Sequence, residues 1–173
     1  MFSFFKKKPA VIKLHAPCTG TFIAQEQISD MAFSQGLLGP GFAIAPKPNN
    51  EGKVIICAPV SGTLSMIFPT KHALAFSVAS SDKSSSNAKD IECILHIGVN
   101  TVELKGEGFK LQEAAKRDIG SFIKAGEELV EVDISTFKEH PSDVIVVLQN
   151  VSEMKLESIK NELFAGEELG SCF

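Results

Sequence analysis

Two of the four histidines stand where their side chains could do chemistry together. His72 and His96 lie in neighbouring strand patterns that are joined by one polar loop, residues 80–90. Because consecutive antiparallel strands usually pair, the two rings are expected to lie close to each other. Such a pair can ligate a metal ion, with a carboxylate or water completing the site. Alternatively, one ring is a nucleophile and the other stabilises the developing charge.

The residues around His96 follow the period of a half-buried strand. His96 falls on the face opposite the apolar residues, beside Gly98, which has no side chain to cover it. An accessible imidazole there can react near neutral pH, although an ordinary surface histidine fits the same spacing. The apolar positions on the other face are Ile91, Cys93, Leu95, Ile97 and Val99.

His72 opens the preceding strand pattern, two residues after Thr70. It alternates in phase with Leu74 and Phe76, so the pattern predicts a position on the apolar side of that strand. A histidine placed there is commonly satisfied by a backbone carbonyl. If the ring instead faces His96, the Thr70 hydroxyl can orient a ring nitrogen and fix its tautomer.

Other catalytic patterns are missing from the sequence. It contains no HExxH motif, no Walker A loop and no GxSxG motif. The glycines of Leu38-Gly39-Pro40-Gly41 do not follow the G-x-G-x-x-G spacing, so they give little support for nucleotide binding. The two histidines are therefore the strongest candidates for chemistry.

The elements that would position them include an internal duplication. The segment 15–21 (HAPCTGT) returns as 57–63 (CAPVSGT), and 125–129 (AGEEL) returns as 165–169 (AGEEL). Each copy of the first motif reads as a strand, a turn with Pro and Gly, and a second strand. Short strands with two-fold repetition predict an all-β protein, a single-domain antiparallel β-sandwich or barrel-sandwich with a duplicated hairpin.

A few other segments have distinct patterns. The continuous apolar run 144–148 predicts a central strand buried on both faces. Residues 29–34 predict one helical turn with Ser29 or Asp30 as its N-cap, and residues 134–140 predict another before Pro141. Residues 152–163 carry Leu156, Ile159 and Leu163 at helical spacing, which favours a short helix.

The composition limits the class of protein. A chain of 173 residues suits one domain with a full core, taken here as residues 10–173. The net charge of -4 argues against a nucleic-acid partner, which needs a basic surface. Four cysteines form no CxxC pair, and three of them, Cys18, Cys57 and Cys93, lie in apolar strand-like surroundings. They are expected to be reduced core residues rather than disulfides.

The N-terminal residues 1–9 form a short leader with aromatic and basic residues. It could contact an anionic membrane surface weakly, or it could be a solvated terminus. No apolar run is long enough for a transmembrane segment, and no signal peptide follows the N-terminal lysines. The expected location is therefore cytoplasmic, with a peripheral position at the inner face of the membrane as a further possibility.

The stretch that begins at His96 resembles a family signature. Residues 96–109 read HIGVNTVELKGEGF, which is similar to the pattern HxGxxTVxLxGxGF of the glucose-type enzyme IIA (EIIA) components of the bacterial phosphoenolpyruvate-dependent sugar phosphotransferase system. Supporting matches run over about residues 10 to 170. They include Ala16-Pro17, Asp30 with Phe33, Ala58-Pro59, Thr70-Lys71-His72-Ala73, Lys124-Ala125-Gly126, Asp133 and Asn150.

The resemblance implies a phosphocarrier. His96 would accept a phosphoryl group on Nε2 from the histidine phosphocarrier protein HPr, as a tele-phosphohistidine. It would pass the group to a cysteine of a sugar-specific EIIB domain, or of an EIICB permease, for sugar uptake and phosphorylation. The resemblance makes the chain an enzyme of the phosphotransferase class, and no cofactor is required for the transfer.

The resemblance also assigns roles around His96. His72 is the second active-site histidine, and Thr70 hydrogen-bonds to it or to its partner. Asp30, Phe33 and Val102 belong to the rim that docks partners. Family members can bind zinc through the two matching histidines, with a carboxylate from a regulated partner, so His72 and His96 are also candidate zinc ligands.

Three positions depart from the family pattern. Asn100 stands where Asp is common, Pro40 replaces a polar residue between two glycines, and residues 80–90 form a longer loop. These differences bear on partner identity more than on phosphoryl transfer. An alternative function is a regulatory module whose phosphorylation state controls a transporter or kinase. A zinc peptidase is disfavoured, because Gly98 interrupts an HxH pair and no HxxxD motif occurs.

Overall fold

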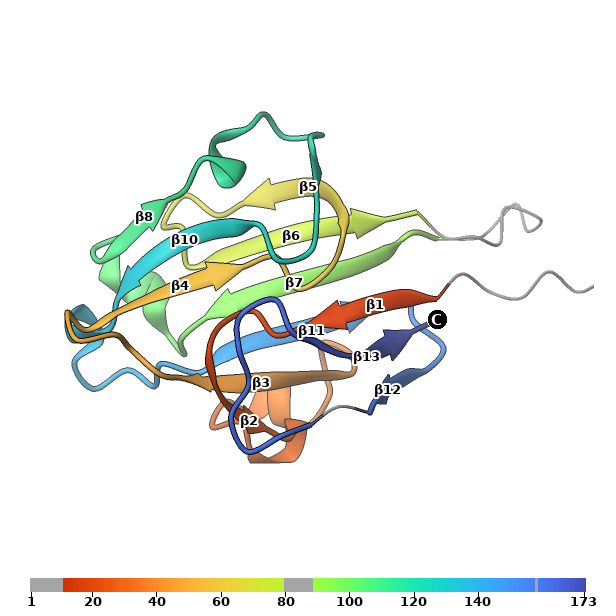
Figure 1. Cartoon of the computed structure of the whole chain (residues 1–173), viewed down its shortest axis with the longest axis horizontal. Helices are drawn as coiled ribbons and strands as arrows, with labels where there is room; N and C mark the ends of the chain where they lie inside the picture. The colour runs from red at the N-terminus through yellow and green to blue at the C-terminus, as the bar shows by residue number, and fades with distance from the viewer. Residues whose placement is uncertain (1–10, 80–88, 158) are drawn as a thin grey trace, which may run out of the picture.

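The computed structural model describes residues 11–79, 89–157 and 159–173. The leader 1–9 and most of the loop 80–90 lie outside these residues. The described chain is built from strands, with a few single helical turns between them (Figure 1). The strands are β1 (Ile12–His15), β2 (Gly20–Ile23), β3 (Gly41–Pro46), β4 (Lys53–Cys57), β5 (Gly62–Ile67), β6 (Ala73–Val78), β7 (Ile91–Ile97), β8 (Phe109–Leu111), β9 (Phe122–Ile123), β10 (Glu128–Asp133), β11 (Val144–Gln149), β12 (Met154–Leu156) and β13 (Glu168–Cys172). The helical turns are α1 (Met31–Ser34) and the 3₁₀ turns η1 (Gln25–Gln27), η2 (Thr101–Leu104), η3 (Ala114–Lys116) and η4 (Ile134–Phe137).

The strands form three antiparallel sheets. A seven-stranded sheet has the order β2-β3-β11-β7-β6-β5-β9, and two three-stranded sheets have the orders β4-β10-β8 and β1-β13-β12. The small sheets pack against one face of the large sheet, with the main core between them (Figure 1). The predicted all-β antiparallel sandwich is confirmed, but the expected duplicated hairpin is wrong. The strands on either side of each repeated turn, β1 with β2 and β4 with β5, belong to different sheets and pair with other strands.

The alternation of β7 decides which face of the large sheet meets the core. Ile91, Cys93, Leu95 and Ile97 are buried in the main core, so His96 lies on the outer face. β11 lies between β3 and β7 and is buried on both faces, as its apolar run predicts. Its residues Ile145 and Val147 belong to a second, smaller apolar cluster on the outer face. His96 lies on the same face of the sheet, next to this second cluster.

The two copies of the first repeated motif form reciprocal hydrogen bonds with each other. The His15 N–H donates to the Pro59 carbonyl at 2.8 Å, and the Cys57 N–H donates to the Pro17 carbonyl at 2.7 Å. The second pair of motifs bonds to the first pair in equivalent ways, because the Gly166 N–H donates to the Ala16 carbonyl and the Gly126 N–H donates to the Ala58 carbonyl. Each half of the sandwich therefore closes on the other through the residues that the sequence repeats.

One predicted element is wrong. Residues 152–163 form no helix among the described residues, and β12 lies within them. Met154 and Leu156 alternate with exposed Lys155, and β12 pairs with β13, so tertiary pairing overrides a helical spacing that rests on only three residues. The helical turns at 29–34 and 134–140 are confirmed as α1 and η4.

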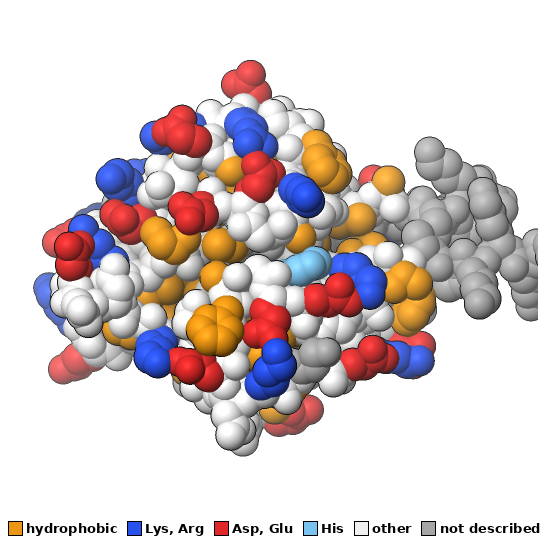
Figure 2. All heavy atoms as spheres, in the orientation of Figure 1, with side chains coloured by type: hydrophobic (Ala, Val, Ile, Leu, Met, Phe, Trp, Pro, Cys, Tyr) orange, Lys and Arg blue, Asp and Glu red, His pale blue; other side chains and the backbone are white. Residues whose placement is uncertain are grey.

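The cysteines and the surface agree with the expectations from composition. Cys18, Cys57, Cys93 and Cys172 are free and buried, and burial raises the pKa of Cys57 and Cys172 to about 11. In Figure 2, acidic and basic side chains are interspersed over the visible face rather than gathered by sign. No helix among the described residues is long and apolar enough to cross a membrane.

Candidate active site

Pairing of β6 with β7 brings the two predicted histidines together. Ala73 is opposite His96 in the register, and the Ile97 N–H donates to the His72 carbonyl at 2.7 Å. The two ring centroids are 5.0 Å apart and the rings are nearly perpendicular, at 78°. The predicted proximity of His72 and His96 is therefore confirmed by the geometry.

A tight turn directs the His72 ring toward His96. The Lys71 N–H donates to the Phe68 carbonyl at 2.7 Å, and Lys71 has the left-handed φ of 60°. The strand begins only at Ala73, so the alternation that predicted His72 on the core side does not extend to it. The ring packs instead against His96 and Phe68, whose centroid lies 5.4 Å away.

The backbone fixes the tautomer of His96. Its Nδ1 lies 2.7 Å from the Gly98 carbonyl oxygen. A carbonyl oxygen only accepts, so Nδ1 carries the proton and donates it. In the neutral ring the lone pair is then on Nε2, which is the nitrogen available to an electrophile.

Thr70 holds the other ring. Its hydroxyl oxygen lies 2.5 Å from His72 Nδ1. The predicted contact between Thr70 and the second histidine is present, and it anchors His72 by the nitrogen next to its side-chain stem. His72 is 6% exposed, so the remaining ring nitrogen has little access to bulk water.

Both imidazoles are held neutral near pH 7. Burial lowers the pKa of His72, and the neighbouring His96 lowers it further. Burial also lowers the pKa of His96, against smaller opposing effects from the Gly98 carbonyl and the Asp30 carboxylate. A neutral ring keeps its lone pair, so these environments favour a nucleophile over a cation.

Apolar side chains border the pair. The Phe33 ring lies 5.3 Å from the His96 ring, and Phe33 packs with Val99, Ile145 and Val147 of the outer cluster. Exposed apolar side chains extend this surface outward, including Met31 at 68% and Val102 at 52% exposure. Such a surface can exclude water once a partner covers it.

The candidate rim residues occupy defined places. Asp30 caps α1 by accepting from the Ala32 N–H at 2.8 Å and, at 3.4 Å, from the Phe33 N–H. Its carboxylate also influences the pKa of His96. Val102 lies on η2, directly after the strand that carries His96. The structure thus brings Asp30 and Phe33 to the histidine pair and leaves Val102 exposed on the following turn.

Sequence reasoning missed two contributors to the site. Phe68 forms one wall beside His72, and an aromatic residue two positions before Thr70 was its only signal. Gly98 supplies the carbonyl that sets the His96 tautomer. A Cβ at Gly98 would lie 2.4 Å from Thr101 Cγ2 and 2.7 Å from Phe137 Cε2, so packing requires glycine there.

The site supplies two nitrogen ligands but no complete metal centre. No group of three His, Cys, Asp or Glu residues that could hold a metal ion occurs within residues 11–79, 89–157 and 159–173. Two histidines alone leave a tetrahedral zinc site half filled. A zinc ion at His72 and His96 would need ligands from another molecule.

Comparisons with known proteins agree with this geometry. Residues 12–155 match the family model described as phosphoenolpyruvate-dependent sugar phosphotransferase system, EIIA 1. The glucose-specific EIIA component of Oceanobacillus iheyensis is 35% identical over 171 residues, which cover 96% of this chain and 93% of that relative. The glucosamine-specific EIICBA component of Bacillus subtilis is 36% identical over 146 residues, or 83% of this chain and 20% of that much longer protein.

A solved structure is similar over nearly the whole chain. It is the glucose permease IIA from Mycoplasma capricolum, which is 35% identical, has a TM-score of 0.73 and aligns over 99% of both chains. The sequence match and the sandwich with its outer-face histidines point the same way. This chain belongs to the EIIA 1 family of the phosphoenolpyruvate-dependent sugar phosphotransferase system.

Proposed function

We propose that this chain carries a phosphoryl group on Nε2 of His96, between the phosphocarrier protein HPr and a sugar-specific EIIB domain. The observation that carries the proposal is the hydrogen bond from His96 Nδ1 to the Gly98 carbonyl at 2.7 Å. It leaves the Nε2 lone pair free, in a ring whose pKa is lowered by burial. The transferred group serves sugar uptake and phosphorylation, and the sugar named for two of the relatives is glucose.

The two transfers balance without a cofactor. In the first, the Nε2 lone pair attacks phosphorus of phospho-HPr, and the donor P–N bond breaks with its electrons returning to the donor imidazole. In the second, a cysteine thiolate of EIIB attacks the same phosphorus. The bond from phosphorus to Nε2 then breaks, and the lone pair returns to His96.

His72 stabilises the charge that moves with the phosphoryl group. When the Thr70 hydroxyl donates to Nδ1 of His72, the ring proton stays on Nε2. That N–H can donate to a phosphoryl oxygen on His96, whose ring lies 5.0 Å away between centroids. Fixed donors of this kind stabilise transferring phosphoryl oxygens.

Partners dock on the surrounding rim. Asp30, Phe33 and Val102 border the pair, and the apolar surface excludes water so that the phosphohistidine is not hydrolysed. In this scheme the exchange takes place in the cytoplasm, at the inner membrane face when EIIB belongs to an EIICB permease. A zinc ion could occupy His72 and His96 only in a complex with a protein that adds a carboxylate.

A labelling assay tests the proposal. Radiolabelled phosphoenolpyruvate, enzyme I and HPr are expected to give an acid-labile label on the native chain and none on His96→Ala. His72→Gln is expected to accept the label but to transfer it to EIIB about a hundredfold more slowly, since it loses the positioned imidazole N–H that stabilises the phosphoryl oxygens. His140→Gln serves as a control outside the pair. Normal labelling of His96→Ala would refute the assignment.

A further inference from the structure

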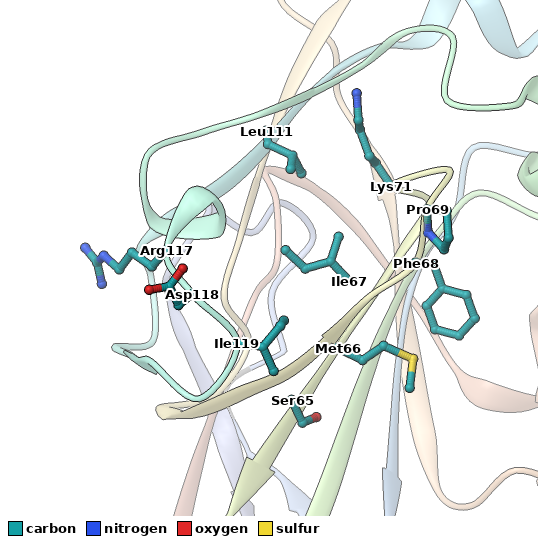
Figure 3. Close-up of a pocket in the computed structure, with 10 residues that line it drawn as sticks. All are labelled: Ser65, Met66, Ile67, Phe68, Pro69, Lys71, Leu111, Arg117, Asp118 and Ile119. Carbon is teal, nitrogen blue, oxygen red and sulfur yellow. The ribbon is translucent and has the colours of Figure 1, made fainter.

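A groove lies next to the histidine pair and shares Phe68 with it. It has a volume of about 530 Å³ and lies between β5 and the loop that follows β8. Figure 3 shows Ile67 and Leu111 above Ile119 in the groove, with Met66 and Phe68 on one side and Arg117 on the other. The groove is thus apolar at its centre, with Lys71 at one border and the oppositely charged Arg117 and Asp118 at another.

The loop that forms one wall is held rigidly. Arg117 makes two hydrogen bonds to the Glu127 carboxylate, at 2.6 and 3.3 Å. The Gly120 N–H donates to the Leu64 carbonyl at 2.8 Å, and the Leu64 N–H donates to the Ser121 carbonyl at 2.9 Å. Before Ile119, the loop is therefore held to Glu127, and after Ile119 it is held to Leu64 of β5 through Gly120 and Ser121.

This rigid loop presents an apolar residue to solvent. Ile119 is 57% exposed, and Met66 and Phe68 across the groove are 49% and 38% exposed. None of these three side chains is buried by the other described residues. Contiguous exposed apolar side chains on a fixed frame are typical of a docking surface.

The groove is continuous with the phosphoryl-transfer site. Phe68 lines the groove and also contacts the His72 ring at 5.4 Å between centroids. Lys71 borders the groove and is the residue next to His72. No carboxylate lies within 4.0 Å of the Lys71 ammonium among the described residues, so its donors can bind a partner's oxygen.

We infer that this groove is an accessory docking site for the EIIB domain, which inserts an apolar side chain between Ile119 and Phe68 and presents an oxygen acceptor to Lys71. The inference rests on the proposed function. His96 must meet its donor and its acceptor in turn on the same surface, so contacts that distinguish the two partners have to lie beside it. Of the two, EIIB is the sugar-specific one, and contacts at the border of a shared surface are suited to select it.

Kinetics of the two transfers test this assignment. Ile119→Asp is expected to raise the KM for EIIB about tenfold, because it places a charge where an apolar side chain would be buried. The kcat of that transfer and the rate of labelling by HPr are expected to stay unchanged. Ile159→Asp is the matched control, since Ile159 is also exposed, at 41%, and lies outside the groove.

The outcomes separate this inference from the proposed function. An unchanged KM for EIIB in Ile119→Asp would overturn the docking site, as would an equal rise in KM for HPr. An equal effect of Ile159→Asp would also overturn it. Failure of the proposed function has a different signature, which is normal labelling of His96→Ala. Circular dichroism of both aspartate variants checks that each is folded.

Discussion

At the scale of residues, the chemistry depends on which nitrogen of each ring holds its proton. The Gly98 carbonyl binds Nδ1 of His96, and the Thr70 hydroxyl binds Nδ1 of His72. Both contacts use Nδ1, so the Nε2 atom of each ring is left to interact with a partner's phosphoryl group. In the proposed scheme the two side chains take different roles, His96 as nucleophile and His72 as hydrogen-bond donor, because a carbonyl only accepts from Nδ1 whereas a hydroxyl can donate to it.

The lowered pKa values of the pair predict the pH dependence of phosphoryl acceptance. Since burial lowers the pKa of both rings, acceptance by His96 is expected to persist to lower pH than for an ordinary histidine and to fall as the pH drops through the lowered pKa. The unfolding free energy is also expected to fall below pH 6.5, because the unfolded chain binds protons that the folded pair excludes.

An NMR titration of the imidazole resonances provides the measurement. The expected midpoints for His72 and His96 lie below the ordinary histidine value, and Nδ1 of His96 is the protonated nitrogen. A midpoint for His96 above 6.5 would contradict both the burial argument and the neutral nucleophile. His96→Gln is the control that assigns the remaining resonance to His72.

The sequence predicted the identity of the reactive residues better than their surroundings. Alternation in β7 placed His96 on the outer face, which depends only on local period. The direction of His72 could not be predicted in that way, because the left-handed Lys71 breaks the period just before the strand. The role of the Gly98 carbonyl could not be predicted either, because every residue has a backbone carbonyl and its hydrogen bond leaves no signal in the sequence.

At the scale of elements, α1 positions two of the candidate docking residues, Asp30 and Phe33, next to His96. This single turn begins at Met31 and is capped by Asp30, whose carboxylate also opposes the burial effect on the pKa of His96. The turn also holds Phe33 against the His96 ring. A residue at a helix cap can therefore influence both local stability and the reactive nitrogen.

Substitutions at Asp30 separate these two effects. Asp30→Ala is expected to lower the free energy of unfolding by about 1 kcal/mol, whereas Asp30→Asn keeps a good cap and is expected to change it little. Both variants lose the charge, so both are expected to lower the pKa of His96 further. Urea unfolding and NMR titration measure the two quantities. Equal stability losses in the two variants would show that the cap is not the cause.

Strand pairing was predictable only in part from turn residues and apolar period. The neighbouring strands β6 and β7 pair as expected, and the apolar run of β11 is a central strand. The repeated segments 15–21 and 57–63 were expected to be hairpins, but each carries the chain from a small sheet into the large sheet. Residues 152–163 showed neither signal of a strand, and their strand β12 forms by pairing with the next strand, β13. The helical spacing of three apolar residues gave no sign of that pairing, so the pattern missed this part of the fold.

At the scale of the whole molecule, the small β1-β13-β12 sheet closes the sandwich. Here β13 lies between β1 and β12, and Gly170 faces Lys155 and Leu156 without a side chain. A Cβ on Gly170 would lie 2.0 Å from the Lys155 carbonyl oxygen. The closure of the fold therefore depends on a close approach between two backbones.

Replacing this glycine is expected to destabilise the whole domain. Gly170→Ala forces β12 away from β13 and is expected to lower the free energy of unfolding by about 1–3 kcal/mol, as overpacking does. Ser171→Ala, at the next position of the same strand, is expected to have little effect. Thermal unfolding of both variants makes the comparison. If the Gly170→Ala protein is as stable as Ser171→Ala, the close approach of the two strands does not contribute to the free energy of unfolding.

The pairing of β1 with β13 also places both ends of the described chain at one end of the molecule. Ile12 is opposite Cys172, whereas β6 begins and β7 ends at the other end, where the histidines lie (Figure 1). A linker joined to either end would therefore attach to the molecule on the side away from His72 and His96. The face with the two histidines would stay free to reach a partner. In a covalently joined arrangement such as the EIICBA relative, linker length would set the local concentration at which that face meets its acceptor.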